Sequence, residues 1–191
     1  MAVRVARHRF TVEEYHKMAQ AGVLAEDDRV ELIEGEVIEM TPIGSRHAGA
    51  VRRLMDAFIP LQLERKAIIS VQDPIRLGTD SEPQPDLALL TPRPDFYSSG
   101  HPGPAEVLLL VEVAETSAGY DREIKLPLYA RFGIPEVWLV DLEEEAIEIH
   151  RRPSAQGYQE VKVQGRGQTI SPGAFPELAI NMEEILSASS D

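Results

Sequence analysis

The stretch from Val107 to Asp141 limits the possible folds of this chain more than any other part of it. It opens with the apolar run Val107–Ala114, which carries one carboxylate, Glu112. A continuous apolar run of this length is typical of a strand that is buried on both faces. A buried carboxylate without a partner costs several kcal/mol or shifts its pKa. Glu112 must therefore bind something or be neutralised, which makes it the first candidate for a functional residue.

A helix is predicted after this run. It begins near Asp121 and ends at Gly133, because an acidic first turn and a glycine after the last apolar residue are helix start and stop signals. Asp121, Lys125 and Tyr129 follow one another at intervals of four residues, so they share one helical face. Pro127 either kinks this helix or lies in its first turn, which leaves the start of the helix open by several residues.

The remaining elements follow from capping and periodicity. Thr11–Glu14 is a capping box that opens a short helix ending near Gly22. Arg29–Met40 alternates apolar and charged residues around Gly35, which predicts a hairpin, although strand parity does not decide between Glu31 and Glu34 as the functional acid. A last weak helix is predicted at residues 181–186. Strands are predicted at residues 67–71, 73–77, 86–90, 136–141, 146–150, 158–163 and 168–170.

A long helix, roughly Ser45 to Arg65, carries the clustered positive charge. Pro60 lies inside it and is expected to bend or divide it. The whole chain has a formal charge of −13, which is the wrong sign for a nucleic-acid binder, because duplex affinity comes mostly from basic groups that neutralise phosphates. Locally the balance reverses, since Arg46, Arg52, Arg53, Arg65 and Lys66 outnumber Asp56 and Glu64. This helix is the best candidate for a phosphate-facing surface, and a solvated helix face is the alternative.

Composition narrows the chemistry further. The chain has 191 residues, a length that suits one domain with a sizeable core. It contains no cysteine, so only carboxylates and imidazoles could serve as side-chain ligands for a metal. No apolar run reaches about 18 residues, so we expect no membrane span, no secretory signal and a cytoplasmic location.

Three segments of the chain resemble the Uma2 family, whose members are described as restriction-endonuclease-like and have the PD-(D/E)xK nuclease fold. The segments are VEVAETS at 111–117, YDREIKLPLYA at 120–130 and GIPEVWLVD at 133–141. Glu31 in the hairpin, His47 and Pro85-Asp86 match further landmarks in the same order, so the resemblance covers roughly residues 10–141. It favours Glu31 as the functional glutamate of the hairpin.

The resemblance implies a fold of the α/β class. We expect residues 1–191 to form a single PD-(D/E)xK nuclease-like domain with a restriction-endonuclease-like core at about residues 29–141. In this core a central mixed β-sheet is flanked by helices. Additional N-terminal and C-terminal strands are expected beside it, and these late strands either cover the sheet or form a subunit interface.

The acids and the lysine of these motifs suit metal-dependent hydrolysis of a phosphodiester. Asp86 and Glu112 would hold Mg²⁺ or Mn²⁺, because hard cations prefer oxygen ligands. Lys125 would orient or activate the attacking water and offset negative charge in the transition state. Glu31 is a candidate additional ligand or a partner of the ligands. We therefore expect catalytic roles for Glu31, Asp86, Glu112 and Lys125.

One position departs from the family motif. Ala114 stands two residues after Glu112, where a lysine would complete the motif. The resemblance implies that the lysine has moved to the following helix, where Lys125 is the match. The alternative is an ordinary ion pair of Lys125 with Asp121, which would also cap the helix. We expect Tyr129 and Trp138 to be core aromatics and Asp141 to be a turn residue at a strand end.

Substrate contacts are predicted at the start of the long helix. His47 could hydrogen-bond a phosphate or help to fix a metal-bound water, or it could be an ordinary surface or capping histidine. Arg46 and Arg52 would contact phosphates. The partners implied are a nucleic acid, DNA in preference to RNA, and a second copy of the chain. Enzymatic activity itself stays open, because a nuclease-like fold could also serve as a non-catalytic binding or assembly protein.

Overall fold

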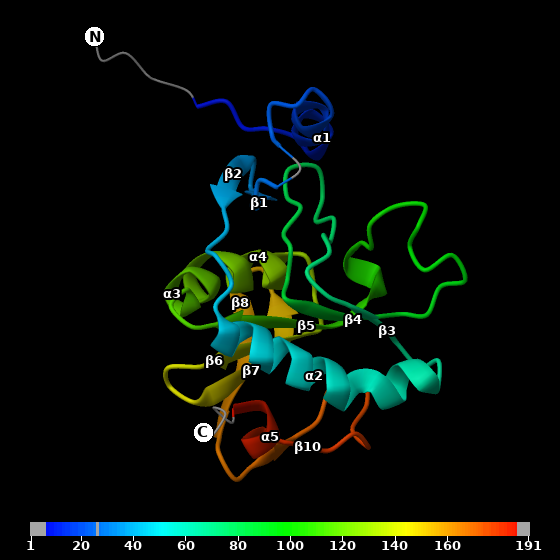
Figure 1. Ribbon diagram of the computed structural model, residues 1–191, viewed down its shortest axis with the longest axis vertical. Coiled ribbons are helices and arrows are strands. Elements are labelled where there is room, and N and C mark those ends of the chain that lie inside the picture. The colour runs from blue at the N-terminus through cyan, green and yellow to red at the C-terminus, as the bar shows by residue number, and fades with distance from the viewer. Residues whose placement is uncertain (1–6, 26, 187–191) are drawn as a thin grey trace.

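A mixed sheet lies at the centre of the computed structural model, which describes residues 7–25 and 27–186 (Figure 1). The order of its strands is β3-β4-β5-β6-β7-β8. All neighbouring strands are antiparallel except β5 and β6, which are parallel. The strands are β3 (Ile68–Ser70), β4 (Leu87–Leu90), β5 (Val107–Ala114), β6 (Glu136–Asp141), β7 (Ala146–Ser154) and β8 (Gly157–Gly165).

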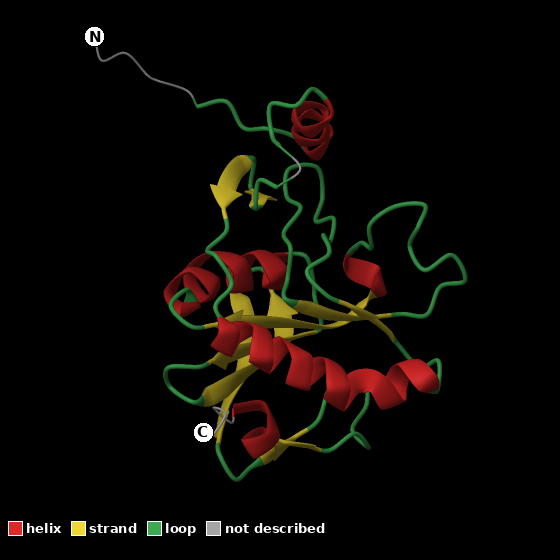
Figure 2. Ribbon diagram, in the orientation of Figure 1, coloured by secondary structure: helices red, strands yellow, loops and turns green. Residues whose placement is uncertain are grey.

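Helices cover both faces of this sheet (Figure 2). One face packs against α2 (Ser45–Leu63) and α5 (Met182–Leu186), with the small pair β9 (Thr169–Ile170) and β10 (Ile180–Asn181) beside α5. The other face packs against one helical segment made of α3 (Ala118–Tyr120), the π-helical turn η2 (Asp121–Lys125) and α4 (Leu126–Arg131). The predicted α/β class and the flanked mixed sheet are confirmed.

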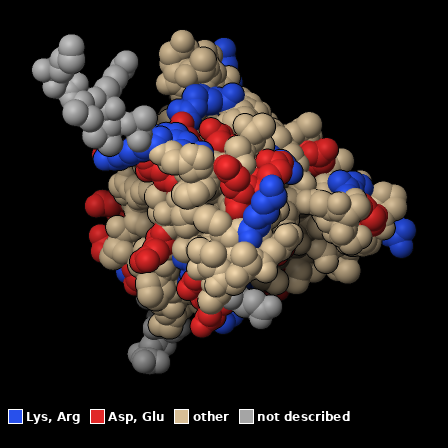
Figure 3. Space-filling view, turned by 90° about the horizontal axis from the view of Figure 1, so that it is seen from above, with Lys and Arg blue, Asp and Glu red and all other residues tan. Residues whose placement is uncertain are grey.

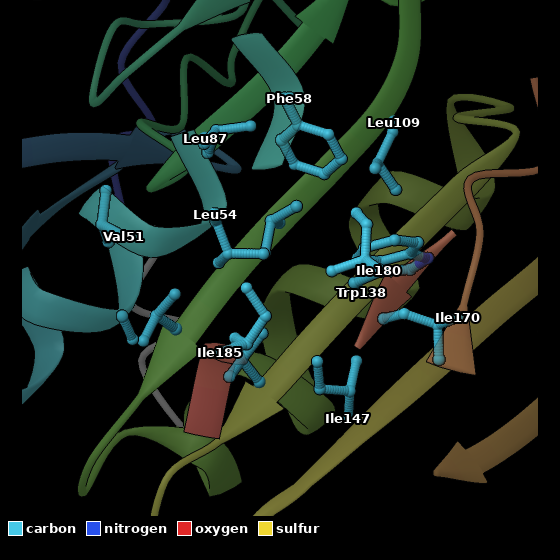
Figure 4. Close-up of a cluster of buried hydrophobic side chains, with 14 of the residues drawn as sticks. Val51, Leu54, Phe58, Leu87, Leu109, Trp138, Ile147, Ile170, Ile180 and Ile185 are labelled. Carbon is cyan, nitrogen blue, oxygen red and sulfur yellow. The ribbon is translucent and has the colours of Figure 1, made fainter. Parts of the chain in front are cut away.

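The alternation of β5 assigns each of its side chains to one face. Leu109, Val111 and Val113 belong to the core beneath α2, where Leu109 lies with Phe58 of α2 and Trp138 of β6 (Figure 4). Leu110 and Ala114 belong to the core beneath α4. Glu112, between those two, therefore faces the helical segment at residues 118–131.

A smaller N-terminal part lies at the top of Figure 1. It contains α1 (Val12–Gln20) and the hairpin of β1 (Val30–Ile33) and β2 (Glu36–Glu39), and it has a hydrophobic cluster of its own. The predicted capping box at Thr11 and Glu14 is present. Backbone hydrogen bonds tie this part to the loop after residue 77, since Val12 donates to Thr79 and Gly35 donates to Asp80. The loop thereby sets the position of β1 relative to the sheet.

One expectation about local structure is wrong. Residues 73–77 form no strand beyond an isolated bridge from Leu77 to Ser81. Their backbone N–H groups instead bond to two different loops. Ile75 donates to the carbonyl of Pro83, and Arg76 donates to the carbonyl of Pro102. The sheet also extends well past residue 141, since β7 and β8 are two of its six strands. The sheet therefore reaches beyond the boundary of about 141 expected for the core.

Prolines do not interrupt the helices that contain them. Pro60 lies inside α2, which continues undivided to Leu63. Pro127 lies in the interior of the helical segment, which begins at Ala118 rather than near Asp121. In the turn before Pro127 the N–H of Leu126 donates to the carbonyl of Asp121, five residues earlier. This wider π turn precedes a residue that has no N–H to donate. Within residues 7–25 and 27–186, no helix is long and apolar enough to span a membrane.

Candidate active site

A pocket of about 390 Å³ lies where the N-terminal hairpin meets the end of β5. One wall is the continuous segment 38–44, which joins β2 to α2. The opposite wall is the loop at residues 115–117 with Tyr120 and Asp121. The space between the walls is lined by five of the residues singled out in the sequence, namely Glu31, His47, Asp86, Glu112 and Lys125. Five side chains that are far apart in the sequence thus meet in one pocket.

Glu112 is almost completely enclosed, with an exposed fraction of 3%. Its Oε1 accepts hydrogen bonds from Lys125 Nζ at 3.3 Å and from the Tyr129 hydroxyl at 2.5 Å. Among the described residues, no side chain or backbone group donates to Oε2. One oxygen of Glu112 is thus held by the protein, and the other is free to bind a ligand in the pocket.

Asp86 lies beside Glu112 because of strand pairing. Leu87 of β4 is opposite Val111 of β5, so the same register sets Asp86 opposite Glu112, and directly opposite residues point to the same face. Oδ2 of Asp86 accepts hydrogen bonds from the backbone N–H of Val113 at 2.8 Å and from His47 Nε2 at 3.0 Å. Asp86 and Glu112 therefore enter the pocket from neighbouring strands.

Glu31 reaches the site from the N-terminal hairpin. Its Oε2 lies 3.1 Å from Lys125 Nζ and accepts a hydrogen bond from the backbone N–H of Gln84, also at 3.1 Å. Glu34, the alternative that strand parity left open, is exposed and pairs with Arg131 outside the pocket. Of the two glutamates, Glu31 therefore lines the pocket and Glu34 does not.

The pocket has a large excess of negative charge. Six carboxylates line it, whereas its cationic side chains are Arg29 and Lys125. Burial raises the pKa of Glu112 to about 8 and the pKa of Asp121 to about 6. Burial opposes the charge of Lys125, but the neighbouring Glu112, Glu31 and Asp121 outweigh it and raise its pKa. Lys125 therefore stays protonated, and the acids carry more charge than it can balance.

The donor set fits a divalent cation bound through few protein ligands. No group of three or more histidine, aspartate or glutamate side chains converges on one point in residues 7–25 and 27–186. Mg²⁺, however, is usually held by one or two carboxylates together with water and substrate phosphates. Asp86 and Glu112 supply two carboxylates, and Oε2 of Glu112 has no hydrogen-bond partner in the described chain. The excess of acids also favours a bound cation.

The structure places the two predicted arginines outside the pocket. Arg46 is exposed, and its guanidinium donates to the carbonyl of Leu142. Arg52 is exposed on α2. A third arginine of this helix, Arg53, donates to the carbonyl of Ile185. On the face shown in Figure 3, Lys and Arg side chains lie among Asp and Glu side chains rather than in one continuous basic area.

Asp121 differs from its expected role. It accepts a hydrogen bond from the Ser117 hydroxyl at 3.1 Å, whereas the ion pairs of Lys125 within the described residues are with Glu31 and Glu112. Asp121 also does not cap the helix, which already begins at Ala118. Asp141 behaves as predicted, because its Oδ1 accepts from the backbone N–H groups of the turn at residues 143 and 144.

Sequence reasoning missed two contributors to the site. Tyr129 is fully buried, as expected of a core aromatic, but its hydroxyl bonds to Glu112. Its spacing of four residues from Lys125 was the available signal, because it puts both side chains on the face that meets the acids. Gln84 also contacts the site, through its backbone N–H. No pattern in a polar loop predicts a backbone contact of that kind.

Known proteins resemble this chain in its sequence family and in its fold. Residues 12–183 match the model of the Uma2 family, described as "Putative restriction endonuclease". A similar solved structure is the crystal structure of a "putative nuclease belonging to DUF820" from Anabaena variabilis. It superposes with a TM-score of 0.71 at 17% sequence identity, over 93% of this chain and 97% of that chain. At this identity the likeness establishes the fold. No curated protein matches the chain.

Proposed function

Because the chain belongs to the Uma2 family, we propose that it is a metal-dependent nuclease that hydrolyses phosphodiester bonds in nucleic acid. The observation that carries the proposal is the pairing of Asp86 and Glu112 in one pocket with Lys125 directly beside Glu112. Carboxylates from two neighbouring strands can hold a metal ion, and the adjacent lysine ammonium can offset negative charge. This combination suits hydrolysis of a phosphodiester. The restriction-endonuclease description of the family supports the same reaction class.

In this proposal each residue has a separate task. Asp86 and Glu112 hold Mg²⁺ or Mn²⁺, which when bound would supply Lewis acidity and lower the pKa of water in the site. Lys125 orients the attacking water and offsets negative charge on the phosphoryl oxygens. Glu31 shares the Lys125 ammonium with Glu112 and so fixes where that charge lies. His47 holds Asp86 in place through its Nε2.

The substrate in this proposal is DNA in preference to RNA, since the description of the family names a restriction endonuclease. The phosphates next to the scissile one would run along the start of α2, where His47 lines the pocket and Arg52 is exposed. Arg46 is the other proposed phosphate contact. To reach a phosphate it would have to give up its bond to the carbonyl of Leu142. We expect Arg52→Ala to weaken DNA binding and to reduce its dependence on salt.

We also propose that the chain forms a homodimer through β8. This strand lies at one edge of the sheet and carries the exposed side chains of Val161 and Val163. If two copies paired antiparallel about Val161, each Glu160 would lie opposite Lys162 of the second copy, and opposite charges stabilise such cross-strand pairs. Sedimentation should show a dimer that Val161→Lys converts to a monomer. A natural protein that sediments as a monomer would refute this interface.

A non-catalytic binding or assembly protein is the second candidate. The negative charge of the pocket favours this candidate. Six carboxylates line the pocket and would repel the phosphates of a nucleic acid, even if a structural metal ion were bound there. The two candidates differ in how they depend on the site. An enzyme needs Asp86, Glu112 and Lys125 together, whereas an assembly module should tolerate the loss of each.

The test is cleavage of a mixed panel of single-stranded and double-stranded DNA and RNA with Mg²⁺ and with Mn²⁺. The natural protein is compared with Asp86→Ala and Lys125→Ala. We expect metal-dependent cleavage by the natural protein and none by either variant. Absence of cleavage by all three, with no heat of Mn²⁺ binding, would favour the assembly protein. Cleavage that survives in both variants would mean that these residues are not the catalytic ones.

A further inference from the structure

The two oxygens of Glu112 have different surroundings. Oε1 accepts from both Lys125 and Tyr129, while Oε2 receives no hydrogen bond from the described residues. A carboxylate that rotated about its last bond would exchange the two oxygens. Only donors that are themselves fixed can prevent this exchange and keep one chosen oxygen toward the pocket.

Lys125 alone is poorly suited to that task. Its ammonium is shared, lying 3.1 Å from Glu31 and 3.3 Å from Glu112. A lysine side chain is also a flexible stem that carries a point charge with rotatable donors. Movement of the ammonium toward Glu31 would lengthen its contact with Glu112. A second donor is needed to hold Oε1 when this happens.

Tyr129 meets that need. It follows Lys125 by one helical turn, and its ring is fully buried in the core between α4 and the sheet. Leu126 and Leu128 of the same helix belong to this core, as does Ala114 of β5. A ring packed on all sides has few alternative rotamers, so the position of its hydroxyl is set by the fold. That hydroxyl lies 2.5 Å from Oε1.

We propose that Tyr129 is a positioning residue, whose hydroxyl fixes Oε1 of Glu112 so that Oε2 is presented to a divalent cation in the pocket. This inference rests on the proposed function, because it assigns Glu112 as a metal ligand. Groups that orient a metal ligand typically change metal affinity by about 10–100-fold when they are lost. Tyr129 would therefore act through Glu112 without touching the substrate.

The test compares Tyr129→Phe with Tyr158→Phe. Tyr158 also packs against the α4 core, and its hydroxyl donates to the carbonyl of Ile134 at 2.9 Å. Each substitution keeps the ring and removes one tyrosine hydrogen bond, so each should lower the melting temperature of the metal-free protein. Mn²⁺ affinity is then measured by calorimetry for both variants and for the natural protein.

We expect Tyr129→Phe to bind Mn²⁺ about 10–100-fold more weakly and Tyr158→Phe to bind it as the natural protein does. Cleavage by Tyr129→Phe should recover at saturating Mn²⁺, because both carboxylates remain. Unchanged Mn²⁺ affinity in Tyr129→Phe would overturn the positioning role and leave the nuclease proposal intact. Equal weakening in both variants would show a general loss of stability and would also overturn it. A natural protein that binds no Mn²⁺ would refute the metal site itself.

Discussion

Glu112 and Glu136 are buried glutamates on the two parallel strands of the sheet, and each has an exposed fraction of 3%. They differ in how their oxygens are used. Glu136, at the start of β6, accepts from Trp138 Nε1 at 2.6 Å and Arg151 Nη2 at 2.9 Å on one oxygen, and from the Gly173 N–H at 2.7 Å on the other. Glu112, near the end of β5, has donors from the described residues on one oxygen only.

The difference separates a structural acid from a candidate for ligand binding. Glu136 has hydrogen bonds on both oxygens and a cationic partner, so it ties the segment at residue 173 to the sheet. Glu112 is crowded by other acids, keeps one oxygen free and has its pKa raised by burial to about 8. A buried acid that the fold leaves incompletely bonded is a candidate for ligand binding, because native proteins rarely leave such groups without a partner.

The largest effect is expected from Glu112→Gln. This change keeps the shape of the side chain and removes its charge, so Lys125 can still pair with Glu31. Metal-based stabilisation of the transition state amounts to several kcal/mol, so cleavage should fall by about 1,000-fold or more. The melting temperature should change little. Cleavage within about tenfold of the natural rate would show that Glu112, like Glu136, is not needed for the reaction.

Glu136→Ala should show the opposite pattern. It leaves the indole of Trp138, the guanidinium of Arg151 and the N–H of Gly173 without their acceptor. Breaking a buried ion pair by removing one partner costs about 3–5 kcal/mol, and the partial exposure of Arg151 favours the lower end. Denaturant unfolding measures this loss. Cleavage per folded molecule should be unchanged, and a selective loss of cleavage would contradict the structural role of Glu136.

Mn²⁺ should stabilise the protein through Glu112 and not through Glu136. A ligand at about one hundred times its dissociation constant stabilises the native state by about 2.7 kcal/mol, which corresponds to roughly 5–10 °C in melting temperature for a chain of this size. Glu112→Gln should lose most of this shift, while Glu136→Ala should keep it from a lower starting temperature. A shift of equal size in both variants would place the cation elsewhere.

The smallest effect is expected at Gly173. A Cβ at this position would lie 2.5 Å from Oε2 of Glu136, so Gly173→Ala should force the segment away from the sheet. Overpacking of this kind costs about 1–3 kcal/mol, measured by thermal unfolding. Gly119→Ala is the control, because a Cβ added at Gly119 would have no neighbouring atom within 4 Å. Equal stability in the two variants would show that the space beside Glu136 can accommodate an added methyl group at position 173.

Much of this organisation could be predicted from the sequence. The apolar runs of β5 and β6 fixed the central strands, and the unpaired acid in the first run identified Glu112. The same reasoning could not distinguish Glu112 from Glu136, because both are acids in apolar strands. The donors that satisfy Glu136 come from Arg151 and Gly173, which only the folded sheet brings near.

The residues that meet in the candidate site were predictable where spacing or the family resemblance carried the information. Spacing put Asp121, Lys125 and Tyr129 on one face, and the family resemblance selected Glu31 over Glu34. Pairing was not predictable, because Lys125 bonds to the acids of β1 and β5 rather than to Asp121 on its own helix. Contacts across the fold replace the local ion pair that was the alternative role of Lys125, because its ammonium lies 3.1 Å from Glu31 and 3.3 Å from Glu112.

Chelation and re-addition of metal in a cleavage assay tests the central claim most directly. The natural protein and Asp86→Asn are treated with a chelator, assayed on the same labelled DNA and assayed again after Mn²⁺ is restored. We predict that the natural protein loses cleavage on chelation and regains it with Mn²⁺, while Asp86→Asn regains none. Cleavage that persists in chelator, or that Mn²⁺ restores equally in both proteins, would contradict a metal-dependent site at Asp86 and Glu112.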